Sequence, residues 1–142
     1  MKLTLLGTGC PSIDYKRCGA SNLVSTKRTK ILIDCGSGVT QRLNQSKNSS
    51  AEIDALLLTH LHTDHVIDLY QLVISSWHSD RDSIWKIYGP KGTKKFIDKI
   101  FLAWKDERKL RIDYEKRKST KALNYKVYEF SKEGNIKIND IK

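Results

Sequence analysis

Three histidines and one aspartate lie within a single six-residue segment, residues 60–65. Imidazole nitrogens and carboxylate oxygens together suit zinc and similar divalent metals. His60 and His62 are two residues apart, so in extended backbone their side chains share a face. Asp64 and His65 are adjacent and cannot easily serve that same point. The spacing therefore predicts two metals, one for each pair of side chains, and two neighbouring metals can drive hydrolysis by activating a water.

A strand and a helix are expected to position these ligands. Residues 53–58 form an apolar run typical of a buried strand, and the histidines follow it directly. Apolar residues at helical spacing predict a helix over 64–76. A polar helix cap formed by Thr63 or Asp64, with the histidines in solvent, is the alternative interpretation of the segment. Three histidines and an aspartate packed this closely at a strand end favour the metal site.

The remaining pattern alternates strands and helices, which predicts an α/β or α+β class with a sheet covered on at least one face. Further strands are expected over 2–6, 21–25, 31–34, 84–88 and 112–114, and further helices beginning at 39 and covering 93–104. Residues 125–130 and 136–138 are expected to form a hairpin. Trp77, Trp85 and Trp104 are expected in the core.

Residues 59–65 resemble the HxHxDH signature of the metallo-β-lactamase superfamily. The blocks at 5–9, 31–43 and 87–93 resemble the ribonuclease Z group and its arylsulfatase-like relatives. The resemblance implies an αββα sandwich, in which two mixed sheets pack face to face between helices. Residues 1–142 would then be one α+β domain that forms the N-terminal half of the sandwich and stops before the C-terminal half.

The same resemblance implies an enzyme that cuts the 3′ trailer from precursor tRNA with two zinc ions, although Mn²⁺ or Fe²⁺ can occupy such sites. It implies that His60 and His62 bind the first metal, and that Asp64 and His65 bind the second. Asp64 would also be the catalytic general base. Asp34 would accept a hydrogen bond from a ligand histidine and fix its ring, with a helix cap or Asx turn as the alternative for this residue.

The superfamily site also needs ligands that this sequence does not supply, since no histidine follows His78. Half a sandwich leaves one apolar sheet face uncovered, so we expect a homodimer or a complementary C-terminal half as partner. Three functions stay open. They are a ribonuclease Z-type phosphodiesterase, an arylsulfatase-like or other small-ester hydrolase, and a fragment that binds metal or RNA without turnover.

Charge is unevenly distributed along the 142 residues. The chain has 26 Lys and Arg against 16 Asp and Glu, a net charge of +10, and residues 81–142 hold 18 of the basic and 9 of the acidic residues. This asymmetry indicates a polyanionic partner such as tRNA or another RNA, with a merely solvated basic surface as the alternative. No apolar run approaches the roughly 18 residues of a membrane span. Three cysteines without a CxxC pair fit a reducing cytoplasm.

Overall fold

Six strands form one mixed sheet whose order follows the sequence, β1-β2-β3-β4-β5-β6. The computed structural model describes residues 1–141. The strands β1 to β3 pair antiparallel, and β3 to β6 pair parallel. Their bounds are β1 Lys2–Gly7, β2 Ser21–Ser25, β3 Lys30–Ile33, β4 Ala55–Leu57, β5 Trp85–Pro90 and β6 Tyr125–Phe130. Because β3, β4 and β5 are parallel, their carboxyl ends share one edge of the sheet.

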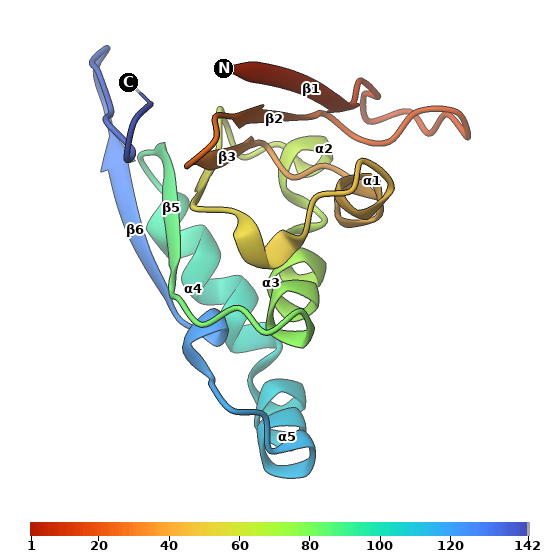
Figure 1. The fold of residues 1–142 in the computed structure, drawn as a ribbon, viewed down its shortest axis with the longest axis vertical. Coiled ribbons are helices and arrows are strands. Elements are labelled where there is room, and N and C mark those ends of the chain that lie inside the picture. The colour runs from red at the N-terminus through yellow and green to blue at the C-terminus, as the bar shows by residue number, and fades with distance from the viewer. Residues whose placement is uncertain (142) are drawn as a thin grey trace.

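Helices cover one face of this sheet, and the last helix projects beyond it (Figure 1). The bounds are α1 Val39–Gln45, α2 Thr63–Val66, α3 Leu69–His78, α4 Thr93–Ala103 and α5 Lys105–Glu115, with 3-10 turns η1 Ser50–Glu52 and η2 Lys121–Leu123. The expected combination of a sheet with covering helices is confirmed. No helix within residues 1–141 is both long and apolar enough to cross a membrane.

The main core lies between the helices and one row of strand residues. Leu23, Leu32, Leu56 and Ile87 are register partners on β2 to β5, and each is at most 1% exposed. They pack with buried side chains of α1, α3 and α4. Burial of large aliphatic side chains stabilises a fold by about 1.5–3 kcal/mol each, so this row fixes how the helices sit on the sheet.

The opposite sheet face is only partly covered. A smaller cluster forms there around Ile31, Ala55 and Ile138, where residues 136–141 lie against the strands. On β1, however, Leu3 and Leu5 are 62% and 64% exposed. The expected uncovered apolar face is therefore present at the β1 end of the sheet.

Two sequence predictions differ from the helices of the structure, one in its bounds and one in the type of element. The helix expected over 64–76 is divided into α2 and α3, because Asp68 turns back toward the strand end: its N–H donates to the Cys35 carbonyl (3.1 Å) and its carboxylate accepts the Thr40 N–H (2.7 Å). The strand expected at 112–114 is wrong, since these residues belong to α5. Arg111 pairs with Glu107 and with Glu115, each four residues away, and such spacing supports a helix.

The predicted C-terminal hairpin and one predicted core residue were also wrong. β6 pairs with β5 in parallel, and residues 136–138 form no strand. Ile138 is buried against Ile31 and Ala55, so apolar contact rather than strand pairing holds this segment. Trp77 and Trp85 are buried as predicted, but Trp104 is 47% exposed, because it lies at the junction of α4 and the projecting α5.

Candidate functional site

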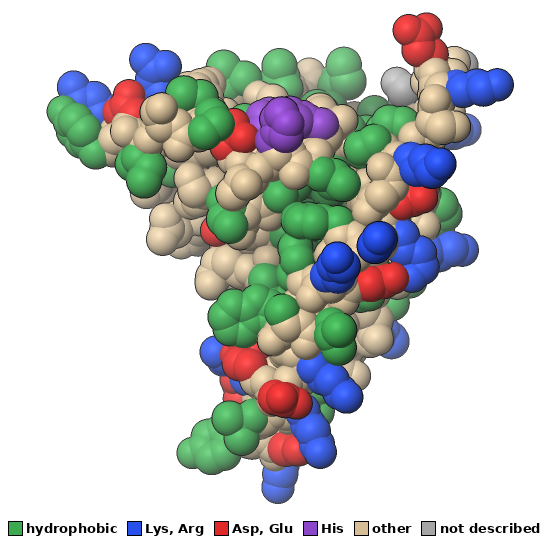
Figure 2. Space-filling model, turned by 180° about the vertical axis from the view of Figure 1, so that it is seen from behind, with side chains coloured by type: hydrophobic (Ala, Val, Ile, Leu, Met, Phe, Trp, Pro, Cys, Tyr) green, Lys and Arg blue, Asp and Glu red, His purple; other side chains and the backbone are tan. Residues whose placement is uncertain are grey.

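Two loops meet at the carboxyl edge of the sheet, one following β3 and the other following β4. Because these strands are parallel neighbours, residues 34–36 and residues 58–65 leave the sheet side by side. The Asp34 N–H donates to the Leu57 carbonyl (2.8 Å), and the Cys35 N–H donates to the His65 carbonyl (2.7 Å). Figure 2 shows the histidines gathered at this edge of the molecule.

All four predicted metal ligands lie together at this edge. The ring centroids of His60 and His62 are 4.6 Å apart, and those of His60 and His65 are 4.0 Å apart. His65 Nε2 lies 3.5 Å from a carboxylate oxygen of Asp64. The α2 N-cap, His62, makes no capping hydrogen bond through its side chain. Thr63 and Asp64, the cap residues of the alternative interpretation, both lie inside α2 and are not its N-cap.

Asp34 is a buried carboxylate, 4% exposed, that accepts hydrogen bonds from both loops. One of its oxygens accepts the Thr59 N–H (2.8 Å), and the other accepts the Thr59 hydroxyl (2.8 Å) and His65 Nδ1 (2.8 Å). The contact to a histidine that the sequence predicted for Asp34 is present. Its backbone is in the left-handed region (φ 60°), which aspartate tolerates better than most residues.

Thr59 is a positioning residue that the sequence analysis missed. Its hydroxyl also lies 2.9 Å from His60 Nδ1. A carboxylate can only accept, and a hydroxyl has one proton, so the Thr59 hydroxyl donates to Asp34 and accepts from His60 Nδ1–H. In the neutral form of each ring, this network places the proton on Nδ1 and leaves the lone pair on Nε2, for His60 through Thr59 and for His65 through the direct bond to Asp34. The sequence feature that could have indicated this role is the position of Thr59, directly before His60 at the end of a strand.

Gly36 allows the loop after β3 to touch the backbone of the histidine segment. A Cβ at Gly36 would overlap the Asp64 carbonyl oxygen and would lie 2.6 Å from the Gly19 carbonyl carbon and 2.7 Å from the Ala20 nitrogen. No side chain fits between these backbone segments. The position of the Asp64 backbone is thus set by direct contact with residue 36.

The donor chemistry of the cluster suits a metal, and one pair of donors also has a suitable distance. Two ligands on a tetrahedral zinc, with bonds of about 2.0–2.1 Å, lie about 3.4 Å apart, which compares with 3.5 Å between Asp64 and His65. Within residues 1–141, however, no group of three or more His, Cys, Asp or Glu side chains is arranged to hold a metal ion. The pair fits a metal, and a closed coordination sphere needs further ligands.

Comparison with known sequences identifies relatives of this chain. A family model described as anti-Pycsar protein Apyc1 matches residues 1–141. Ribonuclease Z of Mycolicibacterium gilvum is 41% identical over 108 residues, which are 73% of this chain and 37% of that protein. Ribonuclease Z of Mycobacterium marinum is 38% identical over 107 residues, 73% of this chain and 38% of that protein. The chain thus spans less than two fifths of the length of these relatives.

Solved structures with the same architecture include human tRNase Z, short form, with a TM-score of 0.67 and 27% identity over 91% of this chain and 44% of that one. The metallo-β-lactamase fold protein YhfI of Bacillus subtilis has a TM-score of 0.68 and 18% identity, over 96% of this chain and 48% of that one. The second likeness concerns the fold alone. Together they confirm the predicted fold class, a mixed sheet flanked by helices as in metallo-β-lactamases.

Proposed function

The chain belongs to the family of the anti-Pycsar protein Apyc1 and has the metallo-β-lactamase fold of ribonuclease Z, and from this premise we propose that its site serves metal-dependent hydrolysis of phosphodiesters. The observation that carries the proposal is the network around Asp34. One buried carboxylate, directly and through Thr59, bonds the Nδ1 atoms of two histidines, so that in each neutral ring Nε2 keeps the lone pair that can bind a metal. Histidines held in this way are typical metal ligands.

In the proposed site His60 and His62 hold one metal, and Asp64 and His65 hold the second. Bound metals would supply a water of lowered pKa and stabilise charge on the phosphoryl oxygens. The mixed donor set favours zinc, with Mn²⁺ or Fe²⁺ as the alternatives. Further ligands would come from residues outside the cluster, since no group of three suitable side chains exists within residues 1–141.

The chain's own residues have distinct proposed roles in the reaction. Asp34 and Thr59 fix the ring orientations of His65 and His60 without touching the substrate. Asp64, whose side chain is 13% exposed, is the proposed general base and accepts a proton from the attacking water. A general base acts from hydrogen-bond distance of the proton that it removes, so the attacking water would have to lie against Asp64, with the phosphodiester next to that water.

Zinc should stabilise the chain through this cluster. A ligand that binds only the folded state stabilises it by about 2.7 kcal/mol at a hundredfold excess over its Kd. We expect the Tm to rise with added zinc in the unchanged chain and to rise less in the His65→Ala variant, which loses a ligand of the second metal. His78→Gln is the matched control, because His78 is bonded to the Ile74 carbonyl and Glu115, away from the cluster. Elemental analysis of dialysed samples identifies the metal, and an equal Tm response in His65→Ala would contradict the proposal.

RNA is the first candidate substrate, and tRNA is the RNA that the name of human tRNase Z specifies. The support in this chain is the basic half of the sequence. A groove of about 490 Å³ at the start of α4 is lined by four lysines and two carboxylates, namely Lys91, Lys94, Lys95, Lys99, Asp98 and Glu129. Phosphate contacts from lysines dominate the affinity of proteins for nucleic acids.

Replacing Lys91, Lys95 and Lys99 together by serine should weaken tRNA binding and reduce its dependence on salt. Each phosphate contact that is lost lowers the slope of log affinity against log salt by about one. Filter binding at several salt concentrations measures the slope. Lys27→Ser, in the turn between β2 and β3, is the control. An unchanged slope in the triple variant would exclude this groove from the RNA-binding surface.

The second candidate function is the anti-Pycsar role named in the family description. It is favoured by coverage, because that family model extends over residues 1–141, whereas the ribonuclease Z relatives match 73% of the chain. Both candidates would use the same metal cluster. Three assays separate the possible functions. They measure cleavage of precursor tRNA, the anti-Pycsar activity, and turnover of an aryl sulfate, which a small-ester hydrolase would cleave. Asp64→Asn is the inactive control in each assay.

The exposed sheet face is the proposed contact for a second copy of the chain or for a complementary C-terminal half. Leu3 and Leu5 lie on the same face as the partly covered cluster around Ile31, because they pair through Val24 and Asn22. Replacing both leucines by threonine should reduce self-association, measured by sedimentation velocity. The same variant should keep its Tm, since both side chains are mostly exposed. Unchanged self-association would place the contact elsewhere.

A further inference from the structure

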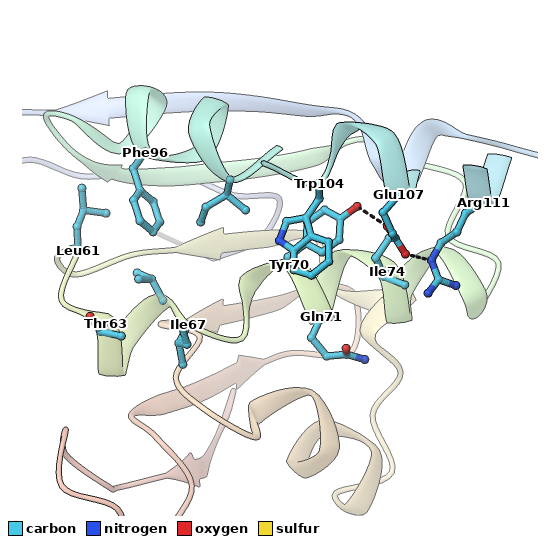
Figure 3. A pocket seen from close by; sticks show the side chains of 12 residues that line it. Leu61, Thr63, Ile67, Tyr70, Gln71, Ile74, Phe96, Trp104, Glu107 and Arg111 are labelled. Atoms are coloured by element: carbon cyan, nitrogen blue, oxygen red, sulfur yellow. Dashed lines mark hydrogen bonds and ion pairs between the residues drawn. The ribbon is translucent and has the colours of Figure 1, made fainter. Parts of the chain in front are cut away.

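An apolar groove of about 620 Å³ runs between the helix pair α2 and α3 and the helix pair α4 and α5. Figure 3 shows Leu61 and Phe96 at one end, and Glu107 and Arg111 at the other. Its walls are mainly aliphatic and aromatic, with a few polar groups. Sites for small organic ligands have this volume and this kind of lining.

The groove begins at the segment that carries the proposed metal ligands. Leu61 and Thr63 line it, and they alternate in sequence with His60, His62 and Asp64. Thr63 and Ile67 also line a second hollow, of about 230 Å³, whose wall includes Asp64. A ligand bound through a phosphate at Asp64 would therefore have the apolar groove directly beside it.

Aromatic rings form the middle of the groove. Trp104 stacks on Tyr70, with centroids 4.9 Å apart and planes at 10°. Trp104 is 47% exposed, so much of its surface is still available. At the polar end the Tyr70 hydroxyl donates to Glu107 (3.1 Å), which is also paired with Arg111. Exposed flat rings that continue an existing stack are suited to a planar heterocycle.

We propose that this groove binds the base of a nucleotide substrate, stacked with Trp104, while the phosphodiester lies at Asp64. The inference rests on the proposed phosphodiesterase function and names a place for the base. Aromatic stacking tolerates any base, because every base has a π-face. The groove would thus hold a nucleotide without selecting strongly among bases.

Trp104 itself reports on the occupant. The chain has three tryptophans, and Trp77 and Trp85 are 1% and 0% exposed. Adenosine 5′-monophosphate should quench tryptophan emission saturably and shield it from acrylamide, with excitation at the red edge where nucleotides absorb little. Ribose 5-phosphate, which has the phosphate but no base, should do neither.

Two variants at one position separate stacking from packing. Equilibrium dialysis with labelled adenosine 5′-monophosphate should show about tenfold or greater loss of affinity in Trp104→Leu and a smaller loss in Trp104→Phe, which keeps a ring. The fluorescence response should vanish in both variants. Leu102→Ala is the control, since Leu102 is 68% exposed near the end of α4 and lines the lysine groove instead.

The proposal is overturned if ribose 5-phosphate acts as well as the nucleotide, or if Trp104→Leu binds the nucleotide unchanged. Shielding of Trp104 that depends on protein concentration without nucleotide would also overturn it, by showing a second copy in the groove. Adenosine, which has the base and no phosphate, keeps the tests independent of the proposed function. It should still quench the emission of Trp104, whereas failure of zinc binding or of phosphodiester cleavage alone would count against the metal site only.

Discussion

Replacing Asp34 by alanine should lower the free energy of unfolding by about 3 kcal/mol, because it removes the acceptor of three hydrogen bonds. The Thr59 N–H loses its partner, and alanine fits the left-handed backbone of residue 34 poorly. Zinc affinity should fall as well, since the rings of His60 and His65 lose their orientation. Urea unfolding and zinc titration against a chelator measure the two effects.

Asp34→Asn distinguishes folding from metal binding. Asparagine keeps one acceptor oxygen for the Thr59 N–H and tolerates the left-handed backbone, so most of the stability should remain. Its amide nitrogen, however, donates, and would face His65 Nδ1. The histidine would then move its proton to Nε2, the atom proposed to bind metal, and zinc affinity should fall about 10–100-fold. Zinc binding like that of the unchanged chain would exclude a role for Asp34 in setting the tautomer.

The second large effect is expected for Gly36→Ala. The added Cβ would meet backbone on both sides, the Asp64 carbonyl and residues 19–20, and backbone cannot rotate away as a side chain can. Overpacking of this kind costs about 1–3 kcal/mol or more. Because the displaced backbone is that of Asp64, zinc should also stabilise the variant less than it stabilises the unchanged chain. Thermal unfolding with and without zinc records both changes.

Gly134→Ala is the matched control for Gly36→Ala. A Cβ at Gly134 would have no neighbour within 4 Å, so its Tm and zinc response should match those of the unchanged chain. Equal behaviour of the two alanine variants would show that the loop after β3 yields freely, and that contact with residue 36 does not determine where Asp64 lies.

Sequence alone predicted the parts of the site that are local. His60, His62, Asp64 and His65 lie within six residues, so any fold that ends a strand before them keeps them together. Asp34 is 31 residues before His65, and its role came from resemblance to a family. The structure supplies the physical reason for the contact, because parallel pairing of β3 and β4 brings both strand ends to one edge.

Features that depend on packing between distant segments were not predictable from pattern. The function of Thr59 depends on a carboxylate 25 residues away. Trp104 has the helical spacing of a core residue, yet the projecting α5 leaves it half exposed. Division of the helix after the histidines depends on Asp68 finding partners at Cys35 and Thr40. In each case the residue is visible in the sequence, but the fold determines which residues surround it.

The strand order of the sheet also bears on how the protein forms during synthesis. Every strand pairs with the strand before it in the sequence, so the sheet can grow by one strand at a time as the ribosome delivers them. Each addition closes a loop between neighbours, which keeps the entropy cost of each step modest. The bond between Asp34 and His65 joins residues that are both made before β5 begins, whereas the Leu58 N–H, just before the histidine segment, donates to the Tyr88 carbonyl of β5 (2.7 Å). This backbone bond of the segment can form only after β5 has been made.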